Sequence, residues 1–462
     1  MSRSRRTPDA IDQRQLAGMA GGALLILVAL LYWGEGSQPG TAIWPNVALW
    51  GGLLLGCGGL SWWLLLSPLP GEQQVEARPR PAVRQALAYG VAASGVLFLI
   101  GGLWDAAWQQ LYGNSAALDG FWGRPHLLLY GSIGLNAALA AGALAVTMRG
   151  PGGLRARVRS DRLVSFLSLA SLFMLVGALS DLAWQRSNAL DSAAWSLPHV
   201  MMGAGFLIVM LVAVAVQGSV LPRPATWEVR RLDMGDLNAV VLLAVAAAIP
   251  LLLGVGGWEA SAGMAAGTVS SRPAWLYPAL IVGVVLFIGQ IALQVLRRPG
   301  AAILVFAAVL FFQAITNFLF QQLFGAVDVG AAAQFLALIP AAALDVVYVY
   351  RLPEADDAST AWIALGAGIV AMLAGGLLLL PRLVADPPVD GATLPGMIVA
   401  GIGVGIFCGW CGARIGRAMA GVRRLPPAAE ATQMRLAALG ASAYIVLLVA
   451  AFLFMKSTPL PP

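Results

Sequence analysis

Charged side chains are scarce in this sequence. Asp, Glu, Lys and Arg make up 11% of its 462 residues, whereas a soluble domain carries about a quarter. Hydrophobic residues account for 59% of the chain, and the mean hydropathy is +0.80. This combination excludes a water-soluble enzyme, a disordered chain and a nucleic-acid-binding protein. Histidine is also scarce, since the sequence contains only His126 and His199.

Apolar runs of about 20 residues, the length that crosses a bilayer as a helix, recur along the chain. Lipid offers no partner for a free backbone group, so helices are the expected form of these runs. The sequence therefore predicts an all-α polytopic membrane protein in which residues 1–462 form a single integral membrane domain. The thirteen predicted spans are 17–33, 45–66, 86–108, 125–148, 163–184, 198–218, 237–256, 274–296, 300–322, 332–350, 361–381, 394–416 and 433–455.

Positive charge is distributed unevenly between the two sides that these spans define. The net charge of +6 comes from 28 basic and 22 acidic residues. If the N-terminus is cytoplasmic, most of the basic residues lie on the cytoplasmic side, as the positive-inside rule requires. The sequence thus predicts a multi-pass protein of the cell (inner or plasma) membrane, with its N-terminus inside and its C-terminus outside. The basic residues left on the outer side are Arg124, Arg186, Arg272, Arg382 and Lys456.

A weak internal repeat accompanies the two histidines. The segment from Gly102 to Gln109 and the segment from Gly177 to Gln185 both contain an aspartate followed by Trp at i+3 and Gln at i+4. Each segment leads through a short outer loop to a Pro-His pair that begins the next span. The repeat units are helical hairpins, predicted at 86–148 and 163–218, with a degraded copy that lacks the histidine at 300–350.

The spacing places these polar residues at one membrane level. Positions i, i+3 and i+4 share a helix face, and proline is favoured in the first turn of a helix. Aspartate and histidine of one hairpin are therefore expected to meet near the outer interface. The side chains so grouped are Asp105, Gln109 and His126 in the first hairpin, and Asp181, Gln185 and His199 in the second. Bonding of each carboxylate to a helix start is the structural alternative.

The pattern resembles a segment of the C subunit of the particulate methane and ammonia monooxygenases. In that family an Asp-x-x-Trp-His stretch leads to a helix that starts with Pro-x-His, and Asp, His and His bind copper in the membrane. The resemblance implies a copper-site subunit in which Asp105, His126, Asp181 and His199 are the metal ligands. Gln109 and Gln185 stand where the family has its middle histidine, and they would support the site.

Several other functions remain open from the residues alone. Two aspartates and two histidines could hold one Cu(II), Zn or Fe(II) ion between the hairpins, or the two histidines could bind haem. Parallel repeats also suit a transporter or channel, and a non-catalytic scaffold subunit would need other membrane subunits as partners besides the lipid bilayer. Cys408 and Cys411 form a CxxC inside an apolar span, where helix packing is the expected role rather than redox chemistry.

Overall fold

Helices account for every regular element that this computed structural model describes. The structure describes residues 14–23, 25, 52, 55–67, 81–112, 123–149, 152–188, 197–221, 231–255, 276–325, 336–351, 366, 394–422 and 430–457. The elements used below are η1 (Trp62–Leu66), α3 (Pro81–Tyr112), α4 (Arg124–Thr147), α5 (Leu154–Arg159), α6 (Arg162–Asn188), α7 (Leu197–Gly218), α8 (Met234–Ala248), η2 (Ile249–Val255), α10 (Leu276–Leu296), α11 (Ala301–Phe324), α12 (Leu338–Arg351), α14 (Leu394–Gly421) and α15 (Glu430–Lys456).

Eight helices in the described part of the chain are long and apolar enough to cross a membrane. They indicate a multi-pass membrane protein, and they match eight of the expected spans. The predicted span 332–350 corresponds to a shorter apolar helix, α12. The predicted span 361–381 lies almost entirely outside the described residues. The total of thirteen spans, the orientation of the termini and the hairpin repeat as a whole therefore stay predictions.

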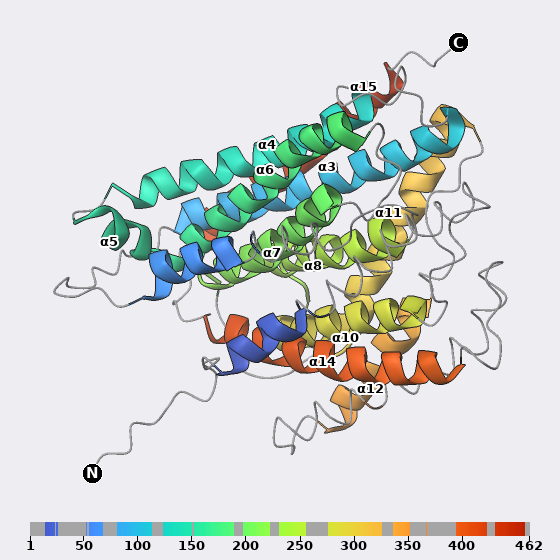
Figure 1. Cartoon of the computed structure of the whole chain (residues 1–462). Helices are drawn as coiled ribbons and strands as arrows, with labels where there is room; N and C mark the ends of the chain where they lie inside the picture. The colour runs from blue at the N-terminus through green and yellow to red at the C-terminus, as the bar shows by residue number, and fades with distance from the viewer. Residues whose placement is uncertain are drawn as a thin grey trace.

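Four of the long helices form a closed ring. α3 packs against α4, α4 against α6, α6 against α7, and α7 back against α3. Figure 1 shows α3, α4 and α6 running side by side, with α7 and α8 beneath them. Because α3 and α6 run in one direction and α4 and α7 return, the predicted first and second hairpins are the two halves of this ring.

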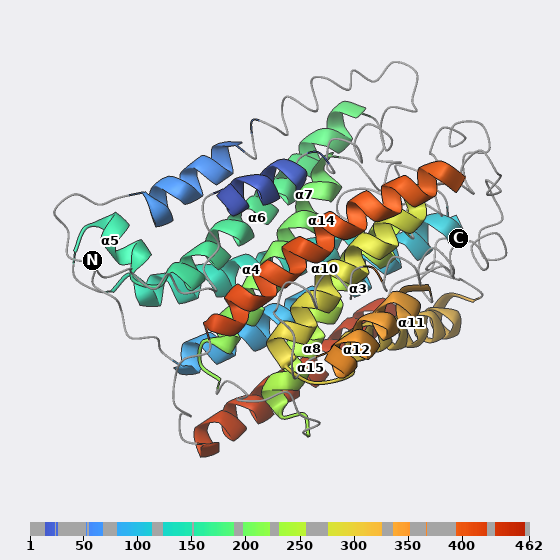
Figure 2. The same ribbon diagram turned by 90° about the horizontal axis from the view of Figure 1, so that it is seen from below.

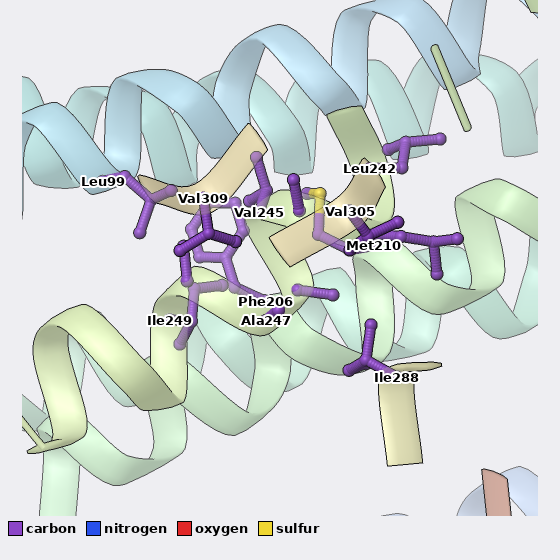
Figure 3. Packing of buried hydrophobic residues seen from close by; sticks show 14 of the residues in the cluster. Leu99, Phe206, Met210, Leu242, Val245, Ala247, Ile249, Ile288, Val305 and Val309 are labelled. Carbon is purple, nitrogen blue, oxygen red and sulfur yellow. The ribbon is translucent and has the colours of Figure 1, made fainter. Parts of the chain in front are cut away.

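α8, α10, α11, α14 and α15 pack on the α3–α7 side of the ring, whereas the short α5 contacts α4 and α6. α8 contacts both α3 and α7, and α10 and α11 contact α8. Figure 2 shows α14 lying along α10, and these two helices form the most extensive pair among the described elements. The shared core is apolar: Figure 3 shows Phe206 and Met210 of α7 meeting Val245 of α8 and Val305 of α11. The polar groups of the ring therefore gather at its ends and in its own seams.

An ion pair joins three helices at one end of the ring. Arg84, near the start of α3, donates to Asp161, which precedes α6, with an Nη2–Oδ2 distance of 2.7 Å. Arg84 also donates to Ser219, directly after α7. Asp161 accepts the backbone N–H of Val164 at 3.2 Å and so caps α6. We call this the Arg84 end of the ring.

The CxxC of α14 lies in a tight helix contact, in agreement with the packing role expected for it. Both cysteines are free thiols. A Cβ atom at Gly283 of α10 would lie 3.3 Å from the sulfur of Cys408, and a Cβ atom at Gly412 would overlap the backbone of Phe287. Small residues thus let α10 and α14 approach closely, as is typical of membrane helices.

Candidate functional site

The first hairpin brings Asp105 and His126 together, as the spacing predicted. Asp105 lies near the end of α3, and His126 lies in the first turn of α4, directly after Pro125. The distance from His126 Nε2 to Asp105 Oδ1 is 3.1 Å, and the side chains are 7% and 15% exposed. A proline in the first turn costs no hydrogen bond, so it starts α4 without displacing the histidine.

The second hairpin repeats this pair in a looser form. His199 follows Pro198 in the first turn of α7, and Asp181 lies on α6. His199 Nε2 is 3.9 Å from Asp181 Oδ1, which is an ion-pair distance but too long for a hydrogen bond. The Asp181 side chain is fully buried, whereas that of His199 is 29% exposed.

Glycines one turn before each aspartate set the two helix crossings. A Cβ atom at Gly101 would lie 2.8 Å from the backbone nitrogen of Leu129, three residues after His126. A Cβ atom at Gly177 would lie 3.2 Å from the backbone nitrogen of Met202, three residues after His199. The two hairpins therefore cross at equivalent positions, and this close approach allows aspartate and histidine to meet one turn farther on.

Tyr130 connects the two pairs. Its hydroxyl donates to Oδ2 of Asp181 across the α4–α6 seam. Tyr130 lies one helical turn after His126, and the two ring centroids are 5.7 Å apart. Asp105, His126, Tyr130, Asp181 and His199 thus form one continuous series of neighbours across three seams of the ring, which we call the Asp–His line.

Aromatic side chains lie next to the start of the Asp–His line. Trp104, beside Asp105 in the sequence, is fully buried and contacts Trp108, Phe324 and Phe454. Arg124 lies over the ring of Phe454, 5.6 Å from its centroid, and donates to Ser457 after α15. This cluster packs the end of α3 against α11 and α15.

The described residues do not complete a metal site. No three side chains among His, Cys, Asp and Glu come together in a metal-binding group in the described ranges. The four predicted ligands are arranged as two pairs, each with one nitrogen and one oxygen donor. Zinc and copper sites use three or four protein ligands. The side chains of Gln109 and Gln185 lie outside the part that the structure describes.

The sequence analysis missed Tyr130 and the two crossing glycines. The signal for Tyr130 was its spacing of four residues from His126, which places both on one face of α4. The signal for Gly101 and Gly177 was their common spacing of four residues before an aspartate. Neither spacing reveals which residue of the neighbouring helix is contacted, because the register between two helices depends on how their side chains pack across the seam.

Comparison with known proteins adds no relative: no family model, curated protein or solved structure matches this chain. The resemblance to the monooxygenase C subunits rests on the quoted residues alone.

Proposed function

We propose that this membrane protein uses the Asp–His line to take up protons and pass them along one end of the helix ring. The observation that carries the proposal is the Tyr130 hydroxyl, which donates to Asp181 of one Asp–His pair and stands beside His126 of the other, so that pairs from separate hairpins are neighbours. Ionisable residues buried in membrane helices are expensive, and proton relays of pumps and transporters are a principal use of them. Proton-coupled transport is therefore the class of function that the site supports best.

The geometry explains how a proton at one histidine affects the other. His126 in its protonated form pairs with the Asp105 carboxylate, whose Oδ1 lies 3.1 Å from Nε2. Asp181 shares its two oxygens between the Tyr130 hydroxyl and His199. A proton gained by His199 draws charge on Asp181 toward the imidazole and weakens the bond from Tyr130, which stands beside His126. We therefore expect a charge on one histidine to affect the other.

The scarcity of histidine makes this coupling measurable. In protein labelled with 15N-histidine in nanodiscs, each of the two imidazoles gives its own nuclear magnetic resonance signals, assigned with His126→Gln and His199→Gln. Removing one histidine is expected to shift the titration midpoint of the other by about one pH unit, the size of interaction that defines coupled sites. Tyr130→Phe is expected to abolish most of this mutual shift while leaving the ring in place.

Tyr348→Phe is the matched control for that experiment. Tyr348 is a buried tyrosine on α12 whose hydroxyl donates to Gln290 at 2.7 Å, away from the Asp–His line. Its loss removes one hydroxyl of the same kind and should leave both histidine titrations unchanged. Independent titration of the two histidines in the unmodified protein would refute the relay.

Copper binding is the alternative that one distance favours. Two ligands about 2.1 Å from one ion, at a right angle, lie about 3 Å apart, and the Asp105–His126 separation is 3.1 Å. The nitrogen and oxygen donors are types that bind metals, but each pair supplies only two protein ligands, fewer than a metal site uses. We expect purified protein, loaded with Cu²⁺ and desalted, to retain no stoichiometric copper by mass spectrometry. One ion per chain that is lost in His126→Gln would replace the proton proposal by a metal site.

A further inference from the structure

Arginines are concentrated where α4 ends and α6 begins, at the Arg84 end of the ring. The short helix α5 lies between α4 and α6 in the chain, beyond their ends (Figure 1). The one carboxylate in the segment 149–162, that of Asp161, pairs with Arg84. The segment therefore carries a large excess of positive charge at one surface of the protein. Its basic residues are Arg149, Arg155, Arg157, Arg159 and Arg162.

Two of these arginines hold a neighbouring helix. Arg155 and Arg159 are four residues apart, which places them on one face of α5. Arg155 Nη2 donates to the backbone oxygen of Trp63 at 2.9 Å, and Arg159 Nε donates to that of Leu64 at 2.7 Å. Both also donate to Ser67 Oγ, directly after η1. Because the last carbonyl groups of a helix lack partners within it, these two arginines have a structural role.

Arg157 and Arg149 lie at the end of α4 instead. Arg157, on the opposite face of α5, donates from Nη1 to the backbone oxygen of Met148 at 3.5 Å, which is long for a hydrogen bond. Its Nε atom has no hydrogen-bond partner among the described residues. Arg149 directly follows Met148 and is exposed. Like charges at neighbouring positions repel each other, so an anion bound here would relieve the repulsion.

An exposed apolar face of α4 leads to these two arginines. Gly142 and Ala145 are exposed and lie seven and four residues before Arg149, a spacing that keeps them on one helix face. Nothing lies within 4 Å of an added Cβ atom at Gly142, so this face has room for an acyl chain. Leu154, three residues before Arg157, is 58% exposed. Because α4 is long enough to cross a membrane, its end lies at the depth of phospholipid head groups.

We propose that Arg149 and Arg157 bind the head group of an anionic phospholipid, whose acyl chains lie against the Gly142–Ala145 face of α4. Phosphate oxygens accept N–H bonds from both guanidinium groups, and such charge-assisted bonds are strong. Arginine suits phosphate because its planar group offers parallel N–H donors. The apolar face beside the cations favours a lipid over a soluble anion. This site is separate from the Asp–His line and goes beyond the proposed function.

Lipid binding to the full-length protein in detergent tests the site. Native mass spectrometry counts bound lipids during titration with phosphatidylglycerol or phosphatidylcholine of identical acyl chains. We expect one phosphatidylglycerol to bind about tenfold more tightly than phosphatidylcholine. Arg149→Gln and Arg157→Gln should each weaken phosphatidylglycerol binding about fivefold, the usual contribution of one basic residue near anionic lipid, and leave phosphatidylcholine binding unchanged. Arg155 and Arg159 stay in place, so η1 keeps its partners.

Arg231→Gln is the matched control, because it removes the same charge at the same end of the ring. Arg231 is exposed and precedes α8. The start of α8 lies beside the end of α7, where Gln217 donates to the backbone oxygen of Gly235 at 3.3 Å. This change should alter phosphatidylglycerol binding less than twofold. An equal loss in Arg231→Gln would mean that the general positive charge of this side attracts the lipid, and it would overturn the site.

Soluble glycerol phosphate separates a lipid site from a site for a free anion. It carries the same phosphate without acyl chains, so at millimolar concentration it should leave phosphatidylglycerol bound. Displacement at that concentration would show that a soluble anion is the ligand and would overturn the lipid proposal. Arg149 is exposed, so Arg149→Gln keeps the test available if Arg157→Gln fails to fold. Neither measurement involves a histidine, and its outcome therefore leaves the proposed function unaffected.

Discussion

Replacing Arg84 with methionine is expected to destabilise the folded protein by about 3–5 kcal/mol, the usual cost of leaving one partner of a buried ion pair alone. The side chains of Arg84 and Asp161 are 10% and 5% exposed. Arg84 donates to Asp161 through both Nε and Nη2, at 3.1 and 2.7 Å, and to Ser219. Methionine keeps most of the volume and removes every one of these bonds, so the Asp161 carboxylate remains buried without its cation.

Reversible unfolding in detergent mixtures, followed by circular dichroism, measures this loss. The companion variant is Arg84→Met with Asp161→Asn, in which no charge is left behind. An asparagine side-chain oxygen still accepts the N–H of Val164, as Asp161 does now at 3.2 Å. The double variant should therefore recover more than half of the lost stability. A single variant as stable as the unmodified protein would show that the pair does not hold the ring together.

Gly101→Ala and Gly177→Ala are each expected to destabilise the protein by about 1–3 kcal/mol, the cost of overpacking a close contact. The added methyl group would lie 2.8 Å from Leu129 N in the first case, and 2.9 Å from Met201 Cβ in the second. Each change forces two helices apart one turn from an Asp–His pair. The first should disturb the imidazole signals of His126, and the second those of His199.

Gly134→Ala provides the matched control for these glycine variants. Gly134 lies on α4, and nothing stands within 4 Å of the position of an added Cβ atom. Alanine there gains helix propensity, worth up to about 1 kcal/mol, so this change should have the opposite sign. Thermal unfolding of the three variants in one detergent separates the two effects. A gain of stability in Gly101→Ala would contradict the close crossing.

Periodicity and helix-start signals located the candidate site, but they could not define its connections. Pro125 and Pro198 marked the helix starts, and the spacing of Asp105 and Asp181 placed each carboxylate at the level of a histidine. These are local properties of a helix, which a single segment encodes. The sequence interpretation left open whether one ion joins all four residues, and the structure arranges them as two pairs bridged by Tyr130.

The features that the sequence did not reveal depend on contacts between helices. Apolar runs predicted α3, α4, α6 and α7 nearly to their ends, because length and hydropathy suffice for a membrane helix. The order of helices around the ring was not predictable in this way. The meeting of Asn136 with Ser171, 35 residues away, depends on that order and on the depth at which each helix sits. Small residues such as Gly101 determine both through packing.

The fourth residue after the histidine differs between the two hairpins, and this difference gives the Asp–His line two different ends. Parallel hairpins are related by an axis along the membrane normal, and full symmetry would place a tyrosine after both histidines. The position that corresponds to Tyr130 in the second hairpin is Gly203, which has no side chain to reach back toward Asp105. With a tyrosine at both positions, the line could close into a circuit, and protons could travel around it equally well in both directions. With one tyrosine the line is open, and its two ends differ in exposure: 15% at Asp105 and 29% at His199.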